Sequence, residues 1–83
     1  MTGSNEARLR TTLAAILEID EAEITDNTAM DSVPVWDSLK HLHLILALED
    51  QFQITLEEET ALNMNSVLLI KRALGNQGVA FPD

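Results

Sequence analysis

Asp37 and Ser38 stand immediately before a long apolar run, and His41 follows the serine by about one helical turn. A serine hydroxyl becomes a nucleophile when a base lies within hydrogen-bonding reach and a third group orients that base. His41 could be such a base, but helical spacing turns it toward the apolar side of the run. No oxyanion-hole motif accompanies the pair, and 83 residues leave little room for a substrate pocket. The sequence therefore favours a non-catalytic role for this serine.

Metal binding finds no support in the pattern of potential ligands. His41 and His43 are two positions apart, so on a helix they point about 200° from each other and cannot share a metal ion. The acidic segment DEAEITDNTAMD, residues 20–31, lacks the central glycine and ligand spacing of a calcium-binding loop. A glycine-rich phosphate-binding loop is missing as well. No residue is therefore assigned as a metal ligand.

A serine at the start of a helix is well placed to hold a phosphate group. The first backbone N–H groups of a helix have no partner within it, and the helix dipole makes this end positive. Serine is also a common N-cap residue, so Asp37 and Ser38 have a purely structural interpretation too. Residue types alone leave both interpretations open.

The element that follows Ser38 is predicted to be a helix over residues 38–52. Its apolar residues cover an arc of about 220° at 100° per residue, which is typical of a central helix or of one that also lines a cavity. These residues are Leu39, Leu42, Leu44, Ile45, Leu46, Leu48 and Phe52, and the narrow polar face carries Lys40, His43, Ala47, Asp50 and Gln51.

Three further helices are predicted from periodicity and capping residues. One covers residues 5–19 after an N-cap at Ser4, a short one lies near residues 57–63, and a last one runs from about 67 to 74 after Ser66, with Gly75 ending it. Residues 75–83 are expected to form a frayed tail. The sequence thus predicts an all-α fold in a single domain, residues 1–83, with a structured core at about 5–74. It is a small four-helix bundle of three main helices and one short helix.

A long loop is predicted between the first two main helices, at residues 18–37. Loops of this length are usually functional or disordered. Scattered apolar residues argue against disorder, because they can anchor the loop to the bundle. They are Ile24, Met30, Val33, Val35 and Trp36. We expect Trp36 to pin the loop without a chemical role.

The charge is strongly negative and unevenly distributed. Fourteen acidic residues oppose five basic ones, and between positions 18 and 59 Lys40 is the only base among twelve acids. Such a field repels nucleic acid and anionic membranes and attracts basic protein surfaces. The chain has no cysteine, no signal peptide pattern and no apolar run that could span a bilayer. We expect a cytoplasmic protein that is monomeric.

The segment WDSLKHLHLILALEDQFQI, residues 36–54, resembles the attachment segment of acyl carrier proteins and related phosphopantetheine-binding domains. The signature of that family is Asp-Ser-Leu at the start of the second helix, followed after apolar residues by Leu-Glu-x-x-Phe. The matching residues here are Asp37, Ser38, Leu39, Leu48, Glu49 and Phe52. Length, acidity, helix order and the long first loop are similar over essentially the whole chain.

The resemblance implies a non-catalytic, free-standing carrier on which partner enzymes act. Ser38 would receive 4′-phosphopantetheine from coenzyme A through a phosphopantetheinyl transferase, and the thiol of this arm would hold an acyl or aminoacyl group as a thioester. Asp37 and Leu39 would contact the transferase, and loading and acyl-transferring enzymes would dock through basic surfaces. The remaining candidates for partner recognition are Lys40, His43, Glu49, Asp50 and Glu58. A cavity for the acyl group would be lined by Leu42, Leu46, Ala61 and Leu62, although for each of them a place in the core is the favoured interpretation.

Two positions depart from the carriers of fatty acid synthesis. Those carriers usually have acids two and five residues after the serine, whereas this chain has Lys40 and His43. The difference favours a dedicated carrier in a specialised biosynthetic pathway over a housekeeping role, although neutral drift at an exposed site would produce the same change. The alternative function is an unmodified acidic interaction module, in which Asp37 and Ser38 only cap the helix.

Overall fold

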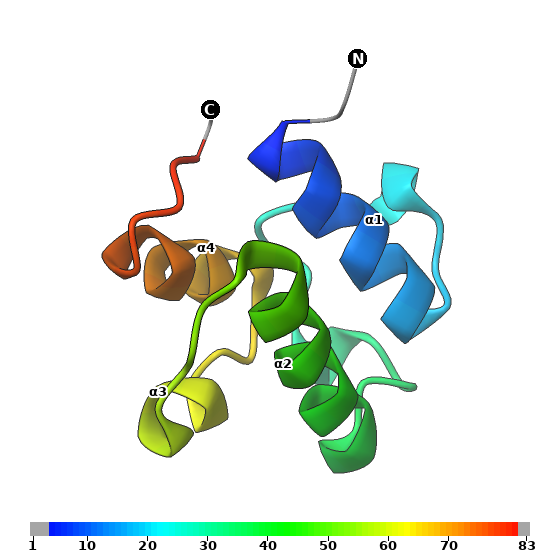
Figure 1. The fold of residues 1–83 in the computed structure, drawn as a ribbon. Coiled ribbons are helices and arrows are strands. Elements are labelled where there is room, and N and C mark those ends of the chain that lie inside the picture. The colour runs from blue at the N-terminus through cyan, green and yellow to red at the C-terminus, as the bar shows by residue number, and fades with distance from the viewer. Residues whose placement is uncertain (1–3, 82–83) are drawn as a thin grey trace.

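The computed structural model describes residues 4–81, and its regular elements in this range are helices (Figure 1). Four α-helices follow one another: α1 (Asn5–Leu17), α2 (Ser38–Phe52), α3 (Glu58–Leu62) and α4 (Val67–Asn76). Two short 3₁₀ helices, η1 (Glu21–Glu23) and η2 (Met30–Ser32), lie between α1 and α2. The predicted all-α fold, with three main helices, one short helix and a long first loop, is confirmed.

The helices begin where the sequence places capping side chains. The Ser4 hydroxyl accepts a hydrogen bond from the Ala7 N–H at 3.1 Å, at the start of α1. The Ser66 hydroxyl accepts one from the Leu69 N–H at 3.2 Å, at the start of α4. Each bond satisfies a backbone donor that the first helical turn leaves without a partner.

Non-glycine residues end the first two main helices. Glu18, with φ 61°, follows Leu17 at the end of α1, and Gln53, with φ 55°, follows α2. Both adopt the left-handed conformation that lets a chain turn away from a helix axis. Helix α1 therefore ends at Leu17, two residues before the predicted end at residue 19.

The end of α4 differs from the prediction. The helix continues through Gly75 to Asn76, so the expectation that Gly75 ends it was wrong. A single glycine lowers helix stability only modestly, so a helix can continue through it. The glycine that adopts the left-handed conformation is Gly78, with φ 95°, which lies after the end of α4. Val79 and Phe81 of the tail pack against the core, and the Phe81 ring meets that of Phe52 edge to face. The last tail residues, 82 and 83, lie outside the described range.

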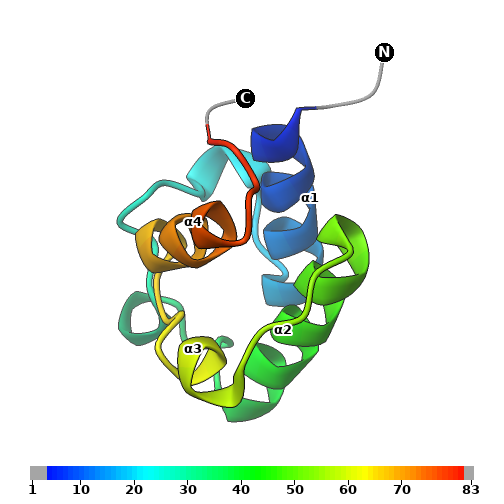
Figure 2. The same cartoon turned by 60° about the vertical axis from the view of Figure 1, so that its left-hand side comes forward.

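The core is formed by apolar faces of α1, α2 and α4 together with residues of the connecting segments. The buried apolar residues are Leu9, Leu13 and Leu17 of α1, Leu44, Ile45 and Leu48 of α2, Val67, Ile70, Ala73 and Leu74 of α4, and Ile24, Val33, Trp36, Leu56 and Met64 between helices. Helix α3 contributes no buried residue. It lies beside the N-terminal half of α2 in both views (Figures 1 and 2).

Buried side chains anchor the long first loop, as predicted. Ile24, Val33 and Trp36 are buried and Met30 packs against the core, whereas Val35 is 41% exposed and is not an anchor. Pro34, which precedes Val35, is exposed as well, so this short stretch between the buried Val33 and Trp36 faces solvent. Backbone bonds also join the loop to the start of α4, through an isolated bridge between residues 29 and 66.

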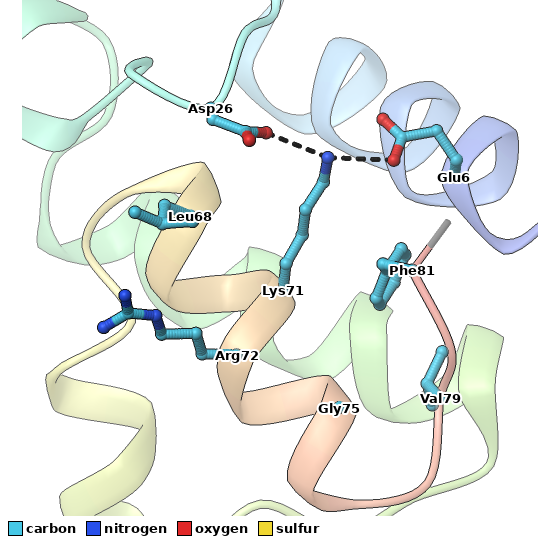
Figure 3. A pocket seen from close by; sticks show the side chains of 8 residues that line it. All are labelled: Glu6, Asp26, Leu68, Lys71, Arg72, Gly75, Val79 and Phe81. Carbon is cyan, nitrogen blue, oxygen red and sulfur yellow. Dashed lines mark hydrogen bonds and ion pairs between the residues drawn. The ribbon is translucent and has the colours of Figure 1, made fainter. Parts of the chain in front are cut away.

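Lys71 of α4 ties the first half of this loop to α1. Its ammonium group lies 2.8 Å from a Glu6 carboxylate oxygen and 2.9 Å from an Asp26 oxygen (Figure 3). These three residues come from α4, α1 and the loop, and they border a pocket that Phe81 of the tail also lines. The ion pairs thus hold three separate segments together on the side of α4 that faces α1.

Candidate functional site

Ser38 is the first residue of α2, and its side chain is exposed. The N-cap is Asp37, whose carboxylate accepts a hydrogen bond from the Lys40 N–H at 2.9 Å. Of the two residues that the sequence offered as a cap, Asp37 fills this role and Ser38 does not. Among residues 4–81, the Ser38 hydroxyl has no hydrogen-bonding partner. This hydroxyl is available to an incoming reagent.

The start of α2 provides a suitable electrostatic setting for a phosphate on Ser38. Asp37 uses one of the free backbone donors of the first turn, and the remaining donors and the helix dipole still face outward. The Asp37 carboxylate is itself negative, so a phosphodiester would experience some repulsion from it. The imidazole of His41, the base considered from the sequence, does not act on the hydroxyl, because both of its ring nitrogens are engaged elsewhere.

A pocket of about 330 Å³ lies beside Ser38, between α2 and the segment that contains α3. Its lining is mostly apolar and consists of Ser38, His41, Leu42, Ile45, Leu56, Glu58, Ala61 and Leu62. Three of the four residues predicted to line an acyl cavity are among these, and Leu46 is not. Leu42, Leu46 and Leu62 are more than half exposed, so they are not core residues. Ala61 is half-buried against the core.

His41 and Trp36 form a buried polar bridge that the sequence analysis did not anticipate. The Trp36 indole N–H donates to Nδ1 of His41 at 3.0 Å, and Nε2 of His41 lies 2.7 Å from the carbonyl oxygen of Ala61. An indole nitrogen can only donate, so Nδ1 accepts and the ring proton sits on Nε2, which donates to Ala61. The bridge connects the loop, α2 and α3. One feature of the sequence could have indicated this bridge: a histidine lies on the apolar face of the helix, five residues after the only tryptophan of the chain.

The predicted partner-recognition residues have different surroundings. Lys40 pairs with Glu18 at 2.7 Å, and this hydrogen bond lowers the pKa of the Glu18 carboxyl. Leu39, His43 and Asp50 are exposed, and Glu58 lies at the pocket. The Glu49 carboxylate accepts a hydrogen bond from the Leu56 N–H at 2.7 Å, so it also holds the segment between α2 and α3 in place.

A family model for the phosphopantetheine attachment site matches residues 7–74, which is most of the chain. The chain belongs to this family of phosphopantetheine-binding carrier proteins. The carrier is also similar to a solved structure named as an acyl carrier protein from Mycobacterium tuberculosis. The two share 30% sequence identity with a TM-score of 0.77, and the match covers 87% of this chain and 96% of that one.

These similarities support a phosphopantetheine-carrying role for the protein, and proteins of this family are generally not catalysts themselves. No helix in the described part of the carrier is long and apolar enough to cross a membrane. Within residues 4–81, no group of three or more histidine, aspartate or glutamate side chains could hold a metal ion. The site of interest in this carrier is thus the start of α2 and the pocket beside it.

Proposed function

We propose that Ser38 is the attachment residue and that the protein carries an acyl or aminoacyl group as a thioester on a 4′-phosphopantetheine arm. The observation that carries the proposal is the exposed Ser38 hydroxyl at the start of α2, inside the segment matched by the family model. The hydroxyl oxygen attacks the phosphorus of coenzyme A that bears pantetheine. A phosphodiester forms, adenosine bisphosphate leaves, and the hydroxyl proton passes to a base of the transferase.

The protein supplies position and access in this scheme, and the arm supplies the reactive thiol. The chain contains no cysteine, so a thioester requires a thiol from the cofactor. The unpaired N–H groups at the start of α2 favour the phosphodiester there. Asp37 holds the helix end in place, while Leu39, which is 61% exposed, offers an apolar contact to the transferase. Partner enzymes perform the chemistry on the tethered group.

Intact-mass measurement tests the attachment directly. The protein is incubated with coenzyme A, magnesium and a broad-specificity phosphopantetheinyl transferase. We expect one added phosphopantetheine, and none in Ser38→Ala, with circular dichroism showing that this variant is folded. Ser66→Ala, which removes another helix-start serine, is a matched control that should still be modified. Failure to modify the unaltered protein, under conditions that modify a known carrier, would favour the unmodified interaction module.

We further propose that the carrier serves a specialised biosynthetic pathway. The support is the face of α2 next to Ser38, where Lys40 and the exposed His43 stand at positions that are acidic in carriers of fatty acid synthesis. Enzymes with basic docking surfaces, adapted to acidic carriers, would meet a lysine there, and like charges disfavour such a complex. The pairing of Lys40 with Glu18 moderates this repulsion without replacing the lysine by an acid. Asp50 and Glu58 remain candidates for contacts with basic groups.

A further inference from the structure

Three observations on the pocket beside Ser38 concern His41. The imidazole lines the pocket, yet only 8% of the residue is exposed. Both of its ring nitrogens are engaged, one by the Trp36 indole and one by the carbonyl oxygen of Ala61. Behind the ring lies Trp36, which is 2% exposed and belongs to the core. A hydrogen-bonded polar bridge therefore forms part of the pocket wall, next to the buried apolar residues Ile45 and Leu56.

The wall formed by α3 depends on this bridge. Helix α3 buries none of its own side chains, and it is only five residues long. In the part of the chain that the structure describes, the bond from His41 to Ala61 is the side-chain hydrogen bond that links α3 to another helix. A chain of methylene groups that entered deeper between α2 and α3 would have to part this bond. The Ala61 carbonyl and the Nε2–H group of His41 would then lose each other as partners, which is unfavourable in an apolar interior.

We propose that His41 sets the depth of the pocket and that its bridge to Trp36 and Ala61 keeps long acyl chains out of the interior. The inference rests on the proposed function and concerns the class of cargo. A short or polar acyl group fits against the exposed leucines at the pocket rim, Leu42 and Leu62. Past this rim the lining has two buried apolar residues, Ile45 and Leu56, and a long saturated chain that reached further would meet the bridge, so most of it stays in contact with solvent. His41 is thus a specificity-determining residue, without a part in the transfer chemistry.

The bridge is tested first in the unmodified protein, where attachment at Ser38 plays no part. We expect nitrogen-15 NMR spectra to show the His41 ring in the tautomer protonated at Nε2. We also expect the Trp36 indole N–H to exchange slowly with solvent. A ring protonated at Nδ1, or an indole proton that exchanges as fast as in a peptide, would overturn the proposal.

The cargo specificity is tested with the protein loaded with butanoyl- or dodecanoyl-pantetheine from the corresponding coenzyme A thioesters. The measured quantity is the rate at which hydroxylamine cleaves each thioester without any partner enzyme. For the unaltered protein we expect the two rates to agree within about twofold. In the double variant Trp36→Phe, His41→Leu, both side chains of the bridge become apolar and only the half-buried Ala61 carbonyl loses its donor, so dodecanoyl should be cleaved roughly tenfold more slowly than butanoyl.

The double variant is preferred because His41→Leu alone would leave the Trp36 indole N–H buried without an acceptor and could prevent folding. Gln51→Leu is the matched control, since it adds a leucine at an exposed position of α2 outside the pocket. It should keep the ratio of the unaltered protein. Protection of dodecanoyl already in the unaltered protein, or no gain in a folded double variant, would overturn the role of His41. Failure of loading appears earlier, in the mass spectrum, and would contradict the proposed function instead.

Discussion

At the scale of single residues, capping of α2 and the proposed attachment of the cofactor belong to two neighbouring residues, Asp37 and Ser38, although one serine could have served both purposes. Asp37 caps α2 through its bond to the Lys40 N–H, and the Ser38 hydroxyl carries no structural bond in the described part of the chain. A residue that must accept a covalent group is thereby freed from stabilising the helix. Modification of Ser38 need not disturb the start of α2.

This division predicts different stabilities for two alanine variants. Ser38→Ala should change the free energy of unfolding by less than about 0.5 kcal/mol, because the residue is exposed and is not the cap. Asp37→Ala should lower it by about 0.5–2 kcal/mol, because the cap is lost. Urea denaturation followed by circular dichroism measures both values. A larger loss for Ser38→Ala than for Asp37→Ala would contradict the assignment of the cap.

At the scale of elements, the long first loop is held to the bundle by side chains that the sequence could only partly identify. Trp36 is an anchor, as its size and isolation suggested, but its indole N–H also donates to His41. The bond joins the end of the loop to the first turn of α2. Losing Trp36 therefore removes both a large buried surface and a hydrogen-bond donor.

Trp36→Ala should lower the free energy of unfolding by about 3–5 kcal/mol, the usual cost of deleting a buried tryptophan side chain. Val35→Ala is the control, because Val35 is 41% exposed and should change stability little. The tryptophan emission of the unaltered protein should be blue-shifted when folded and move to the red on denaturation. An emission maximum typical of free tryptophan in the native protein would show that the loop is not held at this residue.

The face of α2 near Ser38 should decide which enzymes accept the carrier. The double change Lys40→Asp, His43→Glu makes this face resemble carriers of fatty acid synthesis. It should raise the efficiency with which a malonyl-transferring enzyme of that pathway uses the modified protein. The gain should be greatest at low salt, where charges are least screened.

The ion pair between Lys40 and Glu18 supplies a control for this comparison. Glu18→Gln releases the lysine from its partner without adding an acid to α2, so it should not improve docking. Steady-state efficiency is measured for the three proteins at several salt concentrations. Equal efficiencies for the unaltered protein and the double variant would remove the main support for a specialised pathway.

The sequence predicted the helices well because each main helix has a strong apolar period and a capping residue. The sequence-based predictions failed at residues whose type is compatible with more than one structural position. Gly75 was taken as a helix end, but it lies within α4, and Val35 was taken as an anchor although it faces solvent. The bridge from His41 to Ala61 joins residues that are distant in sequence, so local pattern could not predict it.

At the scale of the whole molecule, Lys71 connects α1, the first loop and α4. Its hydrogen bond to Glu6 lowers the pKa of that carboxyl, although partial burial works in the opposite direction. Burial also works against the charged form of Lys71, but the bonds to Glu6 and Asp26 outweigh it and raise the lysine pKa. Because the pKa of Glu6 is lower in the folded protein, the unfolded protein binds more protons at this carboxyl. The stability that Glu6 contributes is therefore fully present above its unfolded pKa. That contribution is lost as pH falls through the lower folded pKa.

Lys71→Met should lower the free energy of unfolding by on the order of 1 kcal/mol near neutral pH, because two partly exposed ion pairs are lost. The difference from the unaltered protein should shrink as pH falls below about 4.5, since protonated Glu6 no longer pairs. It should also shrink at strongly alkaline pH, once Lys71 loses its proton. Urea denaturation across pH measures the difference. A difference that stays constant down to pH 3 would contradict the role of the ion pairs.

The described chain begins and ends on the same side of the molecule. The start of α1 and the end of the described tail lie at one end, and the start of α2 lies at the opposite end in both views (Figures 1 and 2). A peptide tag, a dye or a surface linker attached beyond either end of the described range would thus extend from the side opposite Ser38. The protein is suited to immobilisation on a solid support with its loading site facing the solution, where transferases and cargo enzymes could be screened in sequence.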